Sequence, residues 1–216
     1  MSGSAKFAPP VRVLSFADGC IQTGPQTLVI TISKGSGIVA KVALAMMVSV
    51  DGYIAADDGG LDWMFPHVGP ELQEHVMAGL QETDTILIGR ETYEGMASTW
   101  PNQSNPVADR MNALPKVVFS RTLEKTEWEN SRLASADVAG EVREIKRRAQ
   151  GDVKVLGGGL LAQSLSELGL IDEYQLAVVP VVLGDGRPLF ADPAELRLES
   201  SRRYDKGVML NVYRPA

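Results

Sequence analysis

Residues 153–160 read VKVLGGGL, and this stretch is the clearest indication of the fold. A strand-like run, Val153–Val155, leads into the glycines Gly157–Gly159 and then into a stretch with helical character that begins at Leu160. Each glycine costs roughly 0.5–1 kcal/mol relative to alanine, so three in a row favour left-handed backbone or close approach by a ligand. A tight structural turn is the alternative interpretation. A strand that ends in glycine and opens a helix is typical of α/β proteins.

The same pattern occurs earlier, where residues 86–93 read ILIGRETY. The apolar run ends at Gly89, and a helix is expected to begin directly after it. A helix start offers unpaired backbone N–H groups to an anion. Gly89 would let a ligand approach the backbone, Arg90 would supply charge and Thr92 a hydroxyl donor. Such turns are also common without a ligand, so this junction alone does not assign a site.

A third junction follows the predicted strand Lys116–Phe119, which runs into Ser120 and Arg121. Open α/β sheets bind ligands at the carboxyl ends of their strands. Arg121 could therefore pair with a ribose 2′-phosphate, although a solvated loop arginine is equally compatible. Neither the GxGxxG fingerprint nor the GxxxxGK[ST] sequence occurs in the chain. Two helix N-termini that converge on one pyrophosphate would serve the same purpose.

Working outward from these junctions, short apolar runs alternate with amphipathic stretches from Lys41 onward, which predicts a single α/β domain. The predicted strands are Val42–Val48, Thr85–Ile88, Lys116–Phe119, Val153–Val155, Glu173–Val179 and Val208–Tyr213. The predicted helices are Pro70–Gln81, Thr92–Ala97, Val107–Leu114, Gly140–Ala149 and Leu160–Leu168.

The composition narrows the class of protein. The chain has 216 residues, of which 44% are hydrophobic and 22% charged, and this is enough for one sizeable core or two small ones. The net charge of −6 argues against binding nucleic acid through its phosphates. No apolar run approaches the roughly 20 residues of a membrane helix. One cysteine and two histidines exclude a structural zinc site and predict a cytoplasmic protein without a metal.

The first forty residues differ from the rest. We interpret residues 1–40 as an N-terminal extension that is either disordered or packed as an extra strand, and residues 41–216 as the folded domain. The extension contains one β-like run, Thr27–Ile32, and a Gly/Ser-containing stretch, Ser33–Gly37, separates this run from the domain. It lacks the pattern of a signal peptide.

Several motifs, taken in order, resemble one known family. They are Met47–Ala55, Leu61–Trp63, Ile88–Glu94, Val118–Arg121, the glycine triplet and the long series from Gly169 to Phe190. Together they resemble the dihydrofolate-reductase-like superfamily, and more closely the reductase domain at the C-terminus of riboflavin-biosynthesis deaminase-reductases. The resemblance covers about Lys41 to Tyr213. It implies an α/β fold with a mostly parallel central sheet flanked by helices.

The resemblance also implies an activity. It predicts an NADPH-dependent oxidoreductase that transfers a hydride to a small pterin- or pyrimidine-like substrate, similar to 5-amino-6-(5-phosphoribosylamino)uracil reductase. Dihydrofolate reduction is the alternative within the enzyme class. A catalytically silent nucleotide-binding protein that keeps the fold is the alternative outside it. The strand Glu173–Val179 and the C-terminal strand resemble the edge that pairs in riboflavin-type reductases, which predicts a homodimer.

The resemblance assigns the predicted cofactor residues. Gly89, Arg90 and Thr92 would hold phosphates of NADPH. Ser120 and Arg121 would hold the 2′-phosphate. Gly157, Gly158 and Gly159, with Leu160, would hold the pyrophosphate, and Met47 would lie near the nicotinamide.

The sequence offers fewer candidates for the substrate-binding and catalytic part of the site. Ser49 and Trp63 are the predicted substrate-binding residues. Protonation of a pterin-like nitrogen needs an acid within hydrogen-bond reach, and Asp51 and Glu71 are the two candidates. Asp51 precedes a glycine and is equally typical of a turn, while Glu71 is typical of a first helical turn. The interval from Trp63 to Glu71 is longer than in the folate enzymes.

One glycine-rich fragment receives a structural interpretation. Residues 183–187 read LGDGR and are similar to a phosphate-binding loop. They are followed by Pro188, Leu189 and Phe190 rather than by a helix, so the helix N-terminus that binds phosphate in such loops is missing.

Overall fold

The computed structural model describes residues 14–16, 19–24, 27–31 and 40–216, with side chains from residue 40 onward. The chain divides into two units, residues 1–39 and 40–216, which are considered separately. No helix among the described residues is long and apolar enough to cross a membrane.

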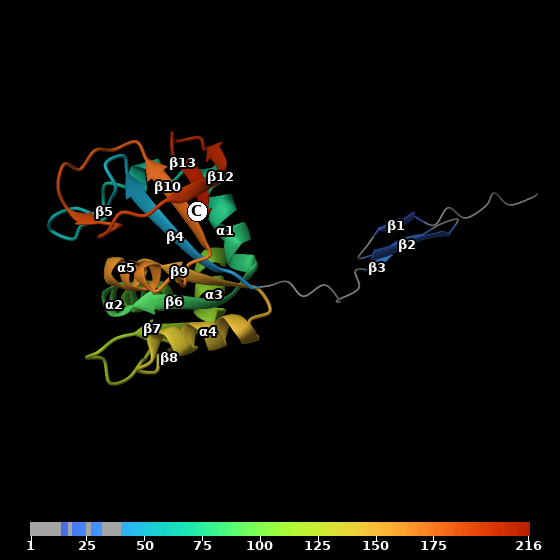
Figure 1. Ribbon diagram of the computed structural model, residues 1–216, viewed down its shortest axis with the longest axis horizontal. Helices are drawn as coiled ribbons and strands as arrows, with labels where there is room; N and C mark the ends of the chain where they lie inside the picture. The colour runs from blue at the N-terminus through green and yellow to red at the C-terminus, as the bar shows by residue number, and fades with distance from the viewer. Residues whose placement is uncertain (1–13, 17–18, 25–26, 32–39) are drawn as a thin grey trace, which may run out of the picture. The chain divides into compact units, whose positions relative to one another are not determined.

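The first unit contains three short strands, β1 (Leu14–Phe16), β2 (Gly19–Gly24) and β3 (Thr27–Thr31). They pair with each other as an antiparallel sheet in the order β1-β2-β3 (Figure 1). The sequence predicted only the third of these strands. The Gly/Ser-containing stretch Ser33–Gly37 lies outside the described residues.

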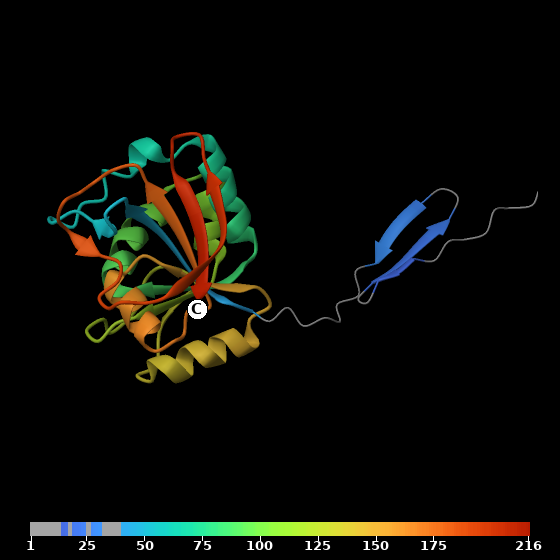
Figure 2. The same ribbon diagram turned by 45° about the horizontal axis from the view of Figure 1, so that its top comes forward.

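The second unit is built on an eight-stranded sheet in the order β12-β13-β10-β4-β9-β6-β7-β8. The strands are β4 (Val42–Ser49), β6 (Thr83–Gly89), β7 (Lys116–Phe119), β8 (Ser131–Leu133), β9 (Asp152–Leu156), β10 (Glu173–Val179), β12 (Leu196–Arg203) and β13 (Met209–Pro215). Every neighbouring pair from β10 to β8 is parallel. The β12–β13 hairpin, red in Figures 1 and 2, adds two antiparallel strands at one end. The predicted mostly parallel sheet is confirmed.

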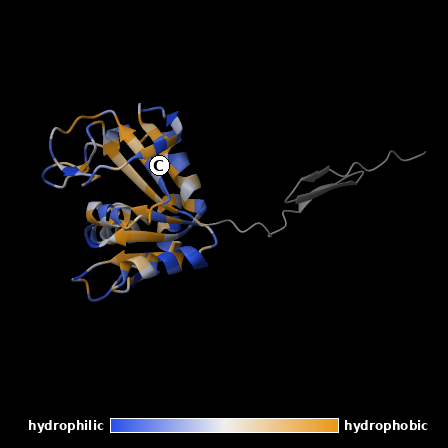
Figure 3. Cartoon of the chain, in the orientation of Figure 1, coloured by the Kyte–Doolittle hydropathy of each residue, from blue (hydrophilic) through white to orange (hydrophobic). Residues whose placement is uncertain are grey.

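Five α-helices cover the sheet on both faces. They are α1 (Pro70–Gln81), α2 (Arg90–Thr99), α3 (Pro106–Ala113), α4 (Val138–Arg148) and α5 (Gly159–Glu167). Apolar side chains of α4 and α5 pack with one set of strand residues, whereas those of α1, α2 and α3 pack with residues that point the other way. Hydrophobic residues gather on the central strands, and polar residues gather on the helices and loops around them (Figure 3). The result is a three-layer α/β/α domain.

Four strands of the second unit were not predicted from the sequence, and one of them is β8, which has only three residues. β12 carries the sequence LRLESSRR and is exposed along almost its whole length, so it lacks the apolar run by which buried strands are recognised. The strands β5 (Tyr53–Ala55) and β11 (Arg187–Pro188) are very short and pair only with each other. Their partners lie far apart in the sequence, so local pattern does not reveal them.

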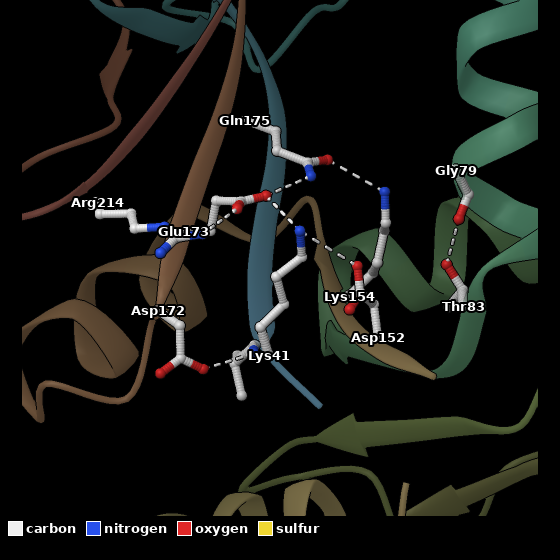
Figure 4. A network of polar contacts seen from close by, with 10 residues as sticks. Lys41, Gly79, Thr83, Asp152, Lys154, Asp172, Glu173, Gln175 and Arg214 are labelled. Carbon is white, nitrogen blue, oxygen red and sulfur yellow. Dashed lines mark hydrogen bonds and ion pairs between the residues drawn. The ribbon is translucent and has the colours of Figure 1, made fainter. Parts of the chain in front are cut away.

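The amino ends of the parallel strands are closed by a polar network of the protein's own side chains (Figure 4). Lys41 contacts Glu173 at 2.9 Å and Asp152 at 3.6 Å. Gln175 donates to Glu173 at 2.8 Å and accepts from Lys154 at 3.1 Å. These polar groups satisfy one another across the starts of β4, β9 and β10. The opposite, carboxyl edge is where the predicted site residues gather.

Candidate cofactor and active site

A groove of about 750 Å³ lies at the carboxyl ends of the parallel strands. Seven of the ten predicted cofactor residues line it, namely Gly89, Arg90, Ser120, Arg121, Gly158, Gly159 and Leu160. These residues come from three separate strand ends, after β6, β7 and β9. The tertiary structure therefore brings the three junctions identified in the sequence together in this single groove.

Two helix N-termini meet in this groove. The N-cap of α2 is Gly89 and the N-cap of α5 is Gly158, and neither helix start is capped by a side chain within residues 40–216. A Cβ placed on Gly158 would lie 3.3 Å from the backbone nitrogen of Gly89, so the two turns are almost in contact. Their unpaired backbone N–H groups and positive dipole ends face the same space, an arrangement that suits a pyrophosphate.

The glycine triplet is required for this close approach. Gly157 and Gly158 have φ values of 60° and 71°, in the left-handed region that glycine adopts at little cost. A Cβ on Gly157 would lie 2.5 Å from the Thr92 methyl carbon. Thr92 thus packs behind the glycine turn and does not line the groove, nor does Gly157 itself. Leu160 is 72% exposed at the groove wall.

Positive charge lines the groove at several points. Arg90 forms hydrogen bonds of 3.0 and 3.2 Å with the Glu94 carboxylate one helical turn later. Arg121 is exposed at the end of β7. Before it, the Ser120 oxygen accepts from the backbone N–H groups of Thr122 and Leu123, which closes a tight turn and leaves the hydroxyl hydrogen available. This geometry is compatible with binding of a phosphate at the β7 end.

Among the groove residues that the sequence analysis overlooked, two are charged, namely Glu91 and Arg187. Arg187 belongs to the LGDGR fragment, which was interpreted as purely structural because no helix follows it. Its position over the groove depends on pairing between β11 and β5, two strands that are more than a hundred residues apart. The only local signal was an arginine directly after Gly186 in a short segment with two glycines.

The predicted substrate end lies on the α1 side of the sheet. Met47 and Trp63 pack against one apolar cluster that includes Leu72 of α1 and the buried Tyr204. The indole N–H of Trp63 is buried without a hydrogen-bond partner among residues 40–216, as is the Tyr204 hydroxyl. Buried donors of this kind are costly, and because this N–H is shielded from solvent it does not itself face a ligand, so the substrate-binding role of Trp63 stays a prediction.

Ser49 and Asp51 are tied to each other and to a distant loop. Ser49 is buried, donates to the Asp51 carboxylate at 2.6 Å and accepts from the Tyr53 backbone at 2.9 Å. Asp51 also accepts from the backbone N–H groups of Leu183 and Gly184. The hydrogen bond from Ser49 is the largest of the causes that lower the pKa of Asp51 to about 2. The carboxylate is thus held as an anion that anchors the loop, which argues against proton donation by Asp51.

Glu71 lies in a different environment. It is exposed in the first turn of α1, beside Leu72 and hence next to the cluster that contains Met47 and Trp63. Burial is the main reason why the pKa of Tyr204 is raised, and the charge of Glu71 adds to it. Glu71 is therefore close to the candidate substrate end but does not line the groove. The catalytic roles of Glu71 and Asp51 stay predictions.

The sheet order, the covering helices and the groove define an α/β protein of the dihydrofolate-reductase-like class. Residues 40–210 match the model of the RibD C-terminal domain, and the chain belongs to this family. The resemblance inferred from the sequence motifs is confirmed.

Individual relatives agree with this assignment. The uncharacterized protein YyaP of Bacillus subtilis (strain 168) is 32% identical over 184 residues, which cover 80% of this chain and 94% of YyaP. A putative riboflavin biosynthesis protein from Shewanella sp. PV-4 superposes with a TM-score of 0.69 at 21% identity, over 82% of this chain and 99% of that protein. Dihydrofolate reductase from Enterococcus faecalis, solved in complex with NADP(H), gives a TM-score of 0.55 at 16% identity, over 81% and 96%. The two structural similarities show the fold alone.

Proposed function

We propose that this protein is an NADPH-dependent reductase that transfers a hydride to a small pterin- or pyrimidine-like substrate. The observation that carries the proposal is the convergence of the α2 and α5 N-termini on one groove that also holds Arg90 and Arg121. A dinucleotide with two linked phosphates and a 2′-phosphate complements such a site in shape and in charge. The bound nicotinamide would supply the hydride.

The proposal gives roles to predicted cofactor residues inside and beside the groove. Gly89, Gly158 and Gly159 contribute backbone N–H groups and space to the pyrophosphate. Ser120 and Arg121 bind the 2′-phosphate, which distinguishes NADPH from NADH. Thr92 supports the glycine turn from behind and acts on the phosphates only through it. Met47, at the carboxyl half of β4, borders the nicotinamide end.

The substrate of this proposal is a heterocycle of the type handled by 5-amino-6-(5-phosphoribosylamino)uracil reductase. Family membership supports this class, and Trp63, which packs on the same apolar cluster as Met47, is the candidate wall of the substrate end. Glu71 is the better of the two candidate acids because Asp51 is committed as an anion. Dihydrofolate reduction is the second candidate, favoured by the fold shared with the Enterococcus enzyme.

We also propose a homodimer. The β10 strand, which the sequence analysis placed at the pairing edge, is hydrogen-bonded on both sides, to β4 and β13, so it has no free edge. The outer strand at that end of the sheet is β12, whose residues are almost all exposed. Pairing would therefore use the β12–β13 hairpin. The mass in solution at micromolar concentration, measured by light scattering, tests this directly.

The decisive experiment for the function is a titration of the purified protein with NADPH and NADH. The nicotinamide absorbance is then followed with dihydrofolate or 5-amino-6-(5-phosphoribosylamino)uracil as oxidant. NADPH-selective binding with turnover of the pyrimidine supports the proposal, and turnover of dihydrofolate alone supports the second candidate. Binding without turnover of either compound would favour a catalytically silent nucleotide-binding protein. Absence of nucleotide binding would contradict all three.

A further inference from the structure

An ion pair crosses the rim of the groove between two segments that are remote in sequence. The Arg187 guanidinium donates to the Glu91 carboxylate at 2.8 Å. Both side chains line the groove and are about half exposed, at 44% and 54%. Arg187 is the main reason why the pKa of Glu91 is lowered. Glu91 is therefore a carboxylate anion at neutral pH that faces the guanidinium of Arg187.

The backbone holds Arg187 in this place. β11 pairs with β5 so that Arg187 lies opposite Ala55. The preceding Gly186 has φ 143°, and a Cβ there would lie 2.2 Å from the Ala55 oxygen, so only glycine fits. On the other side of the loop, the Asp51 carboxylate binds the backbone N–H of Gly184 at 2.7 Å. These contacts fix the backbone of the loop and hold Arg187 at one position beside the groove.

The side chain of Arg187 passes directly over the start of α5. A Cβ on Gly159 would lie 3.0 Å from the Arg187 Cδ atom. The guanidinium beyond this contact reaches Glu91 in the first turn of α2. Arg187 therefore spans the two helix N-termini whose N–H groups converge on the groove.

The other arginines are less suited to this position. Arg90 lines the groove, but its closer partner is Glu94 at 3.0 Å and its contact with Glu91 is longer, at 3.9 Å, while Arg121 belongs to the end of β7. Glu91 would repel an anion at the two helix starts, because its negative charge faces the same groove. A phosphate can occupy this space most favourably if it takes over the partner of Glu91, which is Arg187.

We propose that Arg187 is a binding residue for the pyrophosphate of the nicotinamide dinucleotide and that Glu91 holds its guanidinium until the pyrophosphate replaces the carboxylate. This inference rests on the proposed function. It gives the LGDGR fragment a direct role in the cofactor site. It also makes Asp51 a positioning residue, which acts through the loop that carries Arg187.

The test is a fluorescence titration of the full chain with NADPH and with NADH. Arg187→Gln is expected to weaken both nucleotides by about tenfold or more and to similar extents, because both contain the pyrophosphate. Arg187→Lys keeps the positive charge but lacks the planar guanidinium group, so its loss of nucleotide affinity is expected to be smaller. Glu91→Gln is expected to tighten both by about three- to fivefold, since an exposed competing ion pair is removed.

A matched control is available elsewhere on the surface. Arg147 forms a 2.8 Å ion pair with Glu144 on α4, so Arg147→Gln removes the same charge away from both the groove and the β12–β13 hairpin. This control is expected to bind like the wild type. Thermal unfolding of each variant verifies that the domain is folded, and Arg187→Lys remains informative if Arg187→Gln does not fold.

The outcomes separate the two proposals. If the wild type binds nucleotide and Arg187→Gln binds both within about twofold of it, the role of Arg187 is refuted and the proposed function stands. A loss confined to NADPH would move Arg187 to the 2′-phosphate and overturn the inference as well. If Glu91→Gln binds the nucleotides more weakly than the wild type, the proposed replacement of the Glu91 carboxylate by the pyrophosphate is refuted. If the wild type binds neither nucleotide, the proposed function fails, and this inference fails with it.

Discussion

The Asp51 carboxylate accepts a 2.7 Å hydrogen bond from the backbone N–H of Gly184, 133 positions later in the chain. This contact joins the turn after β4 to the loop before β11. The first segment was predicted to be catalytic and the second to be structural, yet they form one unit. Asp51 is thereby a fixed anion, and its influence on the groove passes through the loop that it anchors.

Asp51→Asn is expected to lower stability in a pH-dependent manner. The pKa of Asp51 lies at about 2, below its ordinary value of 3.8, so the folded state favours the charged form. The resulting stabilisation is fully present above pH 3.8 and is lost as the pH falls through about 2. Urea unfolding of wild type and variant should differ at pH 7 and converge near pH 2. Asp57→Asn, on the neighbouring loop, is the control, and a constant difference down to pH 2 would contradict the prediction.

Arg121→Ala is expected to discriminate between the two nucleotides. NADH has no 2′-phosphate and therefore lacks this charge-assisted contact. The affinity for NADPH should fall at least about tenfold, while the affinity for NADH should change less than about twofold. Paired titrations measure this ratio. Arg143→Ala on the outside of α4 removes an exposed arginine elsewhere and should change neither affinity. Equal losses for both nucleotides would refute the assignment.

Gly158→Ala is expected to damage both folding and binding. The residue has φ 71°, and a Cβ would lie 3.3 Å from the Gly89 nitrogen, at the point where the two helix starts meet. The strain should lower the free energy of unfolding by about 1–2 kcal/mol and weaken both nucleotides.

Gly95→Ala within α2 is the matched control for Gly158→Ala. Gly95 is in a helix, with no heavy atom within 4 Å of its Cβ position. Its replacement should raise stability by about 0.5–1 kcal/mol, because alanine costs less conformational entropy in a helix. Equal effects of the two substitutions on denaturant unfolding would contradict the argument.

Lys116→Met is expected to destabilise the domain strongly. The Lys116 side chain is fully buried, and its Nζ donates to the carbonyls of Met111, Asn112 and Leu114 at 2.7–3.1 Å. Methionine preserves the length but leaves these acceptors without their donor, at a cost of about 3 kcal/mol. The urea midpoint measures the loss. A change smaller than about 1 kcal/mol would show that water replaces the ammonium group there.

Glu71→Gln is expected to reduce turnover without affecting nucleotide affinity. A positioned acid contributes on the order of 10²–10⁴ to rate, so kcat should fall at least about a hundredfold. Glu74→Gln, an exposed carboxylate one turn further along α1, is the control. If both variants retain wild-type kcat, another group supplies the proton.

The sequence predicted the fold well because the buried strands and the helices between them carry local signals. Val42–Ser49, Lys116–Phe119 and Glu173–Val179 are rich in Val, Ile or Leu where both faces are covered, and the predicted and observed bounds agree closely. Exposed β12 has no such run and was missed. Its pairing depends on β13, whose contribution only the assembled sheet reveals.

For the candidate site, the sequence by itself determined the three strand-end junctions, two of which open a helix, because glycines, hydroxyls and arginines at strand ends are local features. Only the tertiary structure decided that these junctions share one groove, that Thr92 supports the glycine turn from behind and that Arg187 meets Glu91. The physical reason is that these contacts join segments up to 96 positions apart. Strand order, register and the short β5–β11 pairing set such distances, and no local pattern encodes them.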